Sequence, residues 1–258
     1  MDLQNAIKII RKYLVIHDQP LKAYQLMEAL NIPELDDLKN KSYGMVRHFY
    51  SQKEHVKAYD IPVPDCELIE PEECAINPQN RYARYAWFME DTKDVKSMID
   101  LGCYVGSLVI ASSRRGAKAV GVDLTTGSIN VAKSRAKKLG KDCNFYVADV
   151  TKFDKGTYDA VVSFEVFEHV LDPQQYIDHL ASLTNDGAWV YITTPDGAYG
   201  NGQGNLDMGW EWQEGNGTRG HLRTFNQKIM RQLLNNYEVA RLSKEPDGLL
   251  WIKYRRKI

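Results

Sequence analysis

The chain has 258 residues, of which 43% are hydrophobic and 26% are charged, and its formal net charge at pH 7 is −1. This length is sufficient for one α/β domain of ordinary size with an extension. The balanced charge argues against a general attraction to phosphate backbones or anionic membranes, and no window is apolar enough to span a membrane.

The cysteine usage indicates a reducing environment. Cys66, Cys74, Cys103 and Cys143 have neither zinc-ligand spacing nor the density of a disulfide framework. Free thiols are the simplest interpretation. The N-terminus also lacks the apolar core of a secretory signal. We therefore expect a cytoplasmic protein.

Residues 1–80 are expected to form a helical extension followed by a connector. Apolar residues recur at helical spacing within 3–14 and again further on, whereas 65–80 is acidic and contains prolines. Asp36 and Asp37 stand where a DNA-recognition helix would begin. A cap over the substrate or a homodimer contact is therefore favoured over DNA binding.

The stretch from Ser97 to Asp123 is the most informative part of the chain. An apolar run ends at Asp100, a turn with Gly102 and Gly106 follows, and a second apolar run ends at Asp123. This order predicts a strand, a tight turn, a helix and a second strand, which is half of an open α/β nucleotide site. Glycines in such a turn let the backbone approach a ligand, and Asp123 offers two acceptor oxygens to a pair of ribose hydroxyls.

The glycine spacing differs from that of the dinucleotide fingerprint. Here the pattern is Asp100-x-Gly102-x-x-x-Gly106, and Tyr104 and Val105 occupy the place of the middle glycine. No glycine is left to bring the backbone close to a pyrophosphate. The turn is therefore suited to a nucleoside without phosphates.

Further elements follow in regular order. A helix is expected before the first strand and two more towards the C-terminus, and the sheet should gain three more strands and a closing antiparallel hairpin. The expected helices are 82–89, 176–183 and 226–235, the strands 144–150, 158–164 and 187–195, and the hairpin strands 237–242 and 249–254.

This order of motifs resembles the class I S-adenosylmethionine-dependent methyltransferases. The resemblance implies an α/β fold over 81–258, Rossmann-like, with a seven-stranded mostly parallel sheet that ends in an antiparallel hairpin, plus the N-terminal helical extension. It implies that S-adenosylmethionine is the cofactor, with Asp123 at the ribose and Asp149, at the end of the third strand, at the adenine amino group. The cofactor-binding residues implied are Asp100, Gly102, Cys103, Gly106, Asp123, Leu124, Asp149, Val150 and Phe164.

Three residues with chemical potential follow the strand 158–164. If a helix begins there, the i, i+3, i+4 spacing places Glu165, Glu168 and His169 on one helical face. Together with His221 they could bind Mg²⁺ or Mn²⁺, which suit carboxylate-rich sites. Alternatively, His169 or His221 accepts a proton, since histidine titrates near neutral pH, and Glu165 assists at the cofactor.

The Glu-x-x-Glu-His pattern is similar to that of ubiquinone-pathway O-methyltransferases and of small-RNA 2′-O-methyltransferases. We expect methyl transfer to a hydroxyl of a small polar or sugar-like acceptor, with a saccharide among the candidates. RNA ribose methylation with a divalent metal is the first alternative, although the chain lacks a basic surface for RNA. A non-catalytic cofactor-binding regulator is the second.

The segment 196–220 is predicted to be a lid over the acceptor. It is rich in glycine, and loops of this length in compact domains are usually functional or disordered. Trp210 and Trp212 supply flat apolar faces that could stack on a sugar ring or a base, so they are the candidate substrate-binding residues.

Overall fold

The computed structural model describes residues 83–141, 143–170, 172–197 and 225–257. The predictions for the extension and connector at 1–80 therefore lie outside the described residues, as does most of the predicted lid. In the described part of the chain, no helix combines the length and the apolarity needed to cross a membrane.

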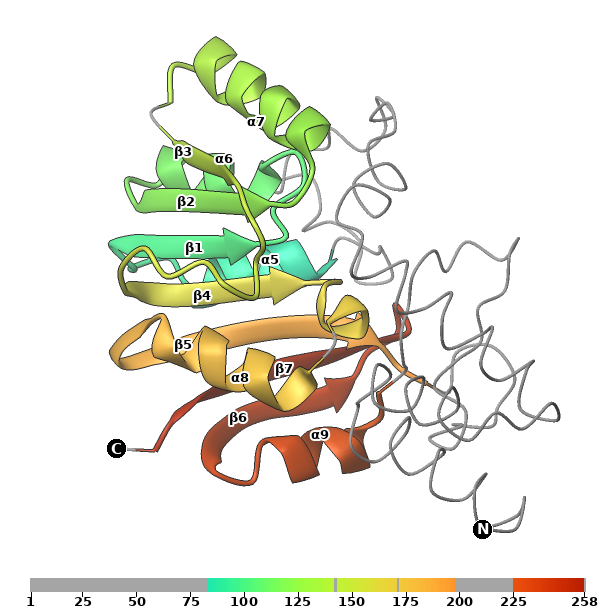
Figure 1. Ribbon diagram of the computed structural model, residues 1–258. Helices are drawn as coiled ribbons and strands as arrows, with labels where there is room; N and C mark the ends of the chain where they lie inside the picture. The colour runs from blue at the N-terminus through green and yellow to red at the C-terminus, as the bar shows by residue number, and fades with distance from the viewer. Residues whose placement is uncertain (1–82, 142, 171, 198–224, 258) are drawn as a thin grey trace, which may run out of the picture.

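A seven-stranded mixed sheet forms the centre of the domain (Figure 1). Its strand order is β3-β2-β1-β4-β5-β7-β6, in which β1 to β5 pair in parallel and β7 is antiparallel to both β5 and β6. The predicted fold class and its closing antiparallel hairpin are thus confirmed. The strands are β1 (Ser97–Leu101), β2 (Lys118–Asp123), β3 (Asn144–Val147), β4 (Tyr158–Phe164), β5 (Thr184–Pro195), β6 (Tyr237–Lys244) and β7 (Leu249–Arg256).

Helices cover both faces of the sheet, because its central strands are apolar on both sides. One buried cluster joins the sheet to α5, α6 and α7, and a second joins the opposite face to α8 and α9. Figure 1 shows α8 in front of the strands. The helices are α5 (Ala83–Asp91), α6 (Ser107–Arg114), α7 (Thr126–Lys138), α8 (Pro173–Ser182) and α9 (Gln227–Leu233), with the short 3₁₀ helix η5 (Phe167–His169).

Local capping explains where α8 and α9 begin. The side chain of Asp172 accepts a hydrogen bond from the Gln175 N–H, and Pro173 occupies the first turn of α8, where its missing donor is tolerated. Asn226 caps α9 in the same way through the Ile229 N–H. Both capping signals are local in sequence, and both helices begin within three residues of the predicted starts.

The order of the strands reverses between β1 and β4. From β1 the chain proceeds outwards through β2 to β3, and it then returns to pair β4 with the other side of β1. In open α/β sheets such a reversal leaves a crevice at the carboxyl ends of the strands, where ligands bind. In Figure 1 the arrowheads of β1, β2 and β4 point to the same side of the sheet.

Two strand boundaries differ from the sequence predictions by three residues. β3 ends at Val147, so Asp149 lies in the loop that follows and not in the strand itself. β5 starts at Thr184 rather than at residue 187, because an irregular register pairs Tyr158 of β4 with Thr184 ahead of the regular ladder. Turn signals at Asn185 and Gly187 concealed this extension, which depends on pairing with a strand distant in sequence.

The glycine at the start of α6 supports a stability prediction. Gly106 has φ 75°, and a Cβ there would lie 2.7 Å from the Phe145 ring, whereas Gly116 has φ 92° and open space around it. Replacement by alanine costs about 1–2 kcal/mol at either site for the left-handed backbone. At Gly106 the steric overlap adds about 1–3 kcal/mol. We therefore expect Gly106→Ala to lower the free energy of unfolding in urea more than the control Gly116→Ala; equal losses would contradict the packing argument.

Candidate active site

The loop after β1 has an unusual backbone. Gly102, Tyr104 and Gly106 all have positive φ, at 91°, 49° and 75°. The N–H groups of Gly102 and Cys103 both donate to the carbonyl of Val122 in β2, at 2.8 and 3.0 Å. The predicted cofactor loop is therefore held tightly against the end of the neighbouring strand. Tyr104 accommodates a conformation that glycine adopts more readily.

Asp123 connects this loop to the start of α7. One of its carboxylate oxygens, Oδ2, accepts from the N–H of Tyr104 at 2.9 Å. The other, Oδ1, accepts from the N–H and the hydroxyl of Thr125 at 2.9 and 2.7 Å. A carboxylate has about four acceptor positions, so these three bonds leave capacity for a ligand hydroxyl. The contact with Tyr104 was not predicted, because it spans 19 residues; the Thr125 contact has a local signal, since Asp two residues before Thr favours such a turn.

Asp100 is buried at the end of β1, with 5% of its surface exposed. This burial, together with the negative charge of Asp123, raises the pKa of Asp100 to about 8. Burial and the same two carboxyls also raise the pKa of the Cys103 thiol. Asp100 is therefore mostly protonated at neutral pH in this structure.

The glycine at position 102 serves packing within the protein. A Cβ there would overlap the side chain of Val166, which belongs to the turn after β4. The loop after β1 and the turn after β4 thus approach each other closely at the point where the strand order reverses. Gly102 is therefore required for packing within the protein, and its predicted contact with the cofactor stays a prediction.

The other predicted cofactor residues lie at the same edge of the sheet. Asp149 accepts hydrogen bonds from the N–H and hydroxyl of Thr151 and lies 3.3 Å from the Lys152 ammonium. Although partial burial acts in the opposite direction, these contacts lower the pKa of Asp149. Leu124 and Val150 are half-buried, and Phe164 is buried at the end of β4.

The predicted helical face of Glu165, Glu168 and His169 does not form. Glu165 has φ 56°, which no regular helix contains, and only the three residues of η5 are helical. The cause is pairing with β5: the Glu165 N–H donates to the carbonyl of Thr193 at 3.0 Å, so β4 is continued by one residue before the chain turns. The helix prediction for this segment is therefore wrong.

Two neighbouring threonines of β5 hold the two carboxyl groups. The hydroxyl of Thr193 donates to Oε1 of Glu165 at 2.9 Å, and the hydroxyl of Thr194 donates to Oε2 of Glu168 at 3.0 Å. Burial and the neighbouring Glu168 raise the pKa of Glu165 to about 8, and burial raises that of Glu168 to about 7. Oε1 of Glu168 lies 3.8 Å from Nε2 of His169.

The described residues provide no group of three or more His, Cys, Asp or Glu side chains arranged to hold a metal ion. His221, the fourth expected ligand, lies outside the described residues, as do Trp210 and Trp212. The chain returns at Phe225, whose ring packs on Phe167 of η5 with the ring centroids 4.4 Å apart. The residues that follow the predicted lid thus lie beside the turn that carries Glu168 and His169.

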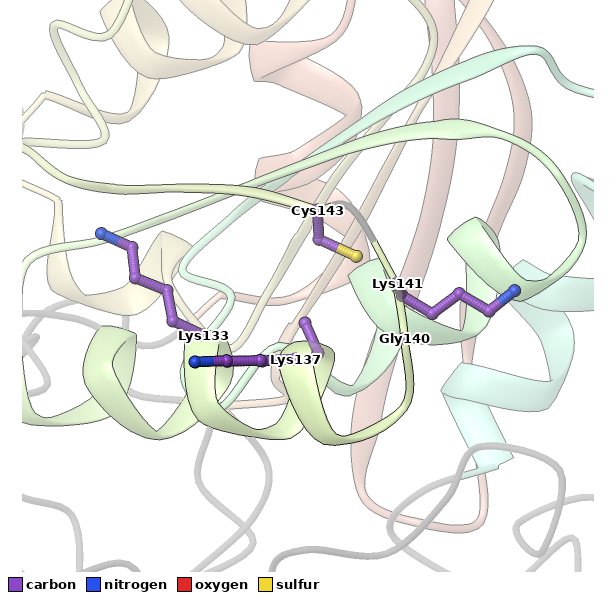
Figure 2. A pocket seen from close by; sticks show the side chains of 6 residues that line it. Lys133, Lys137, Gly140, Lys141 and Cys143 are labelled. Carbon is purple, nitrogen blue, oxygen red and sulfur yellow. The ribbon is translucent and has the colours of Figure 1, made fainter.

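A separate hollow of about 380 Å³ lies at the far end of α7 (Figure 2). The side chains of Lys133 and Lys137 extend to one side of it and that of Lys141 to the other, so their ammonium groups do not converge. From Thr126 to Lys137 the helix rises about 16 Å away from the carboxyl end of β2. This hollow is therefore distinct from the predicted site. Its lining is Lys133, Ala136, Lys137, Gly140, Lys141 and Cys143.

The fold and the loop after β1 define a class I S-adenosylmethionine-dependent methyltransferase. Residues 76–242 match the family described as "Methyltransferase domain", and the chain belongs to this family.

Curated relatives include the ubiquinone biosynthesis O-methyltransferase of Chromobacterium violaceum, 32% identical over 102 residues that cover 38% of this chain and 44% of that protein. The mitochondrial protein of the same name from Dictyostelium discoideum is 37% identical over 111 residues, covering 38% of this chain and 35% of that protein. The chain thus spans less than half the length of these two relatives.

Solved structures with a similar fold include the magnesium protoporphyrin IX methyltransferase from Synechocystis PCC 6803 with bound SAH. Its TM-score is 0.55 at 18% identity, and the match covers 83% of this chain and all of that one. An N-methyltransferase from Bradyrhizobium japonicum WM9, in complex with S-adenosyl-l-homocysteine, also has a TM-score of 0.55, at 15% identity, with coverage of 82% and 100%. At these identities the similarity shows the shared fold.

The raised pKa of Asp100 predicts how stability depends on pH. Its folded pKa of about 8 exceeds the unfolded value of about 3.9, so between these values the folded state binds more protons than the unfolded state. The contribution of Asp100 to stability therefore falls as pH rises from 4 to 8. Asp100→Asn should remove this contribution, so its free energy of unfolding should improve relative to wild type between pH 5 and pH 8. The free energies of unfolding are measured in urea at pH 5 and at pH 8. If the difference between Asp100→Asn and wild type is the same at both pH values, this account is contradicted.

Proposed function

We propose that this protein transfers a methyl group from S-adenosylmethionine to a hydroxyl of a small organic acceptor. The observation that carries the proposal is the proximity of two segments at the switch point of the sheet. The loop with the acidic and glycine residues after β1 faces the turn with Glu165 and His169 after β4, and Val166 joins them. The relatives named O-methyltransferases support oxygen as the accepting atom.

The residues at this edge fit the cofactor chemically. Asp123 retains acceptor capacity for ribose hydroxyls, and Asp149 is held ionised by its neighbours as an acceptor for the adenine amino group. The loop after β1 is held in place by hydrogen bonds from the Gly102 and Cys103 N–H groups to Val122 and from the Tyr104 N–H to Asp123, so the predicted cofactor loop is fixed in position. When bound, S-adenosylmethionine supplies a methyl group on a positively charged sulfur.

Proton removal from the acceptor is assigned to His169. The imidazole of His169 would take the hydroxyl proton of the acceptor as the methyl group is transferred from the sulfur of the cofactor to the acceptor oxygen. His169 is partly exposed, at 17% of its side-chain surface, and lies beside the buried carboxyl of Glu168. A negative charge there would stabilise the imidazolium that forms. His221, which lies outside the described residues, is a second candidate base.

The acceptor is tested by isotope transfer. Purified protein is incubated with methyl-labelled S-adenosylmethionine and three probes: 3,4-dihydroxybenzoate as a phenol, glucose as a saccharide, and a short RNA oligonucleotide. We expect label in a small-molecule probe. Label in RNA alone would support ribose methylation instead, and cofactor binding without transfer to any small hydroxyl compound would favour a regulator.

The cofactor assignment predicts an effect of Asp123→Ala on binding. Loss of two charge-assisted hydrogen bonds to the ribose should weaken S-adenosylmethionine binding by about 2 kcal/mol or more, measured by calorimetric titration. Because Asp123 also holds Tyr104 and Thr125, Thr125→Val serves as a control that removes one internal bond while keeping the carboxylate. Unchanged affinity in a folded Asp123→Ala protein would refute the assignment.

The role of His169 is separated from that of a metal by chelation. If His169 is the base, His169→Gln should lower kcat by about 10²- to 10⁴-fold with little change in cofactor affinity, and activity should survive EDTA. If Mg²⁺ or Mn²⁺ is bound by Glu165, Glu168, His169 and His221, EDTA should abolish transfer and either ion should restore it. The second result would replace the simple-base mechanism.

A further inference from the structure

We propose that Thr193 is a positioning residue that holds the Glu165 carboxyl at the reacting end of the site; this rests on the proposed methyl transfer. Thr193 contacts Glu165 at two points. Its carbonyl accepts from the Glu165 N–H at 3.0 Å, and its hydroxyl donates to Oε1 at 2.9 Å. One residue thus restrains both the backbone and the side chain of its partner.

The support that Thr193 offers is rigid. It is fully buried within β5, where it pairs with Phe164 of β4 on one side and with Trp251 of β7 on the other. A residue in the interior of a sheet, paired on both edges, has little freedom to move. Glu165, in contrast, has left-handed φ, a conformation that costs a non-glycine residue of order 1–3 kcal/mol and persists only when the surroundings enforce it.

The neighbouring threonine shows why Thr193, and not the pair, is assigned this role. Thr194 binds Glu168, whose side chain is 1% exposed and so cannot meet a substrate directly. Glu165 is half-buried, so it is the more exposed of the two residues whose carboxyls β5 holds. Of the two carboxyls held by β5, Glu165 is therefore the one whose placement governs contact with bound molecules.

A purely structural explanation exists for the Thr193 bond. Buried hydroxyls require a hydrogen-bond partner, and Glu165 supplies one. The two explanations differ in what removal of the hydroxyl changes. If the bond only satisfies a buried hydroxyl, its removal lowers the stability of the protein. If the bond positions Glu165, its removal lowers turnover, because small displacements of catalytic groups reduce rates strongly.

The test compares Thr193→Val, Thr193→Ser and the control Thr184→Val. Thr184 lies at the opposite end of the same strand, is also buried, and its hydroxyl donates to the Ala181 carbonyl at 2.7 Å. For the panel acceptor that the wild-type protein methylates, Thr193→Val should lower kcat by about 10- to 100-fold with KM for the acceptor and Kd for the cofactor little changed. Thr193→Ser, which keeps the hydroxyl, should recover most of the turnover, and Thr184→Val should lose thermal stability alone.

The outcomes are distinguishable. If Thr193→Val keeps wild-type kcat, or if Thr193→Ser is as slow as Thr193→Val, the positioning role is refuted while methyl transfer stands. A loss of kcat in Thr184→Val as large as that in Thr193→Val would also refute it, because a general weakening of β5 would then explain both. If the wild-type protein transfers no methyl group to any probe, the proposed function fails and the positioning role fails with it.

Discussion

The site depends on the pairing of β1 with β2 on one edge and with β4 on the other. After β1 the chain forms β2 and β3 on one side of β1, and it then returns to form β4 on the other side. The connections at the carboxyl ends of β1 and β4 therefore diverge from each other. The loop after β1 and the turn after β4 are then forced into the same crevice, where Gly102 leaves room for Val166. Glu165 and His169 belong to the turn after β4, and Asp123 is hydrogen-bonded to the loop after β1.

The charges at this edge follow two opposite arrangements. Asp123 and Asp149 accept hydrogen bonds from backbone and hydroxyl donors. Asp100, Glu165 and Glu168 are instead buried deeply enough that their pKa values rise to about 7 or 8. Buried ionisable groups lower stability at neutral pH, and groups perturbed in this way concentrate at functional sites. The raised pKa values of the three buried carboxyls therefore point to chemistry at the ends of β1 and β4. The hydrogen-bonded carboxylates Asp123 and Asp149 point to recognition of polar groups.

Much of the fold could be predicted because its signals are local. The apolar runs that end at Asp100, Asp123 and Phe164 became β1, β2 and β4, and the helices expected at 176–183 and 226–235 correspond to α8 and α9. The turn after β4 was predicted wrongly for an equally specific reason. Its spacing favours a helix, but one hydrogen bond to the Thr193 carbonyl, 28 residues away, draws Glu165 into the ladder and out of helical geometry.

The sequence by itself determined the strand–turn–helix order and the acids at the ends of the first two strands, since these depend on apolar periodicity and turn chemistry within a few residues. The cofactor followed from the resemblance of this order of motifs to a known family. Only the tertiary structure decided that Asp123 restrains Tyr104, that Val166 fills the space beside Gly102, and that β5 threonines hold Glu165 and Glu168. These contacts join residues that no local pattern links. They form because parallel strands bring distant carboxyl ends to one edge, where burial and hydrogen bonding then select the partners.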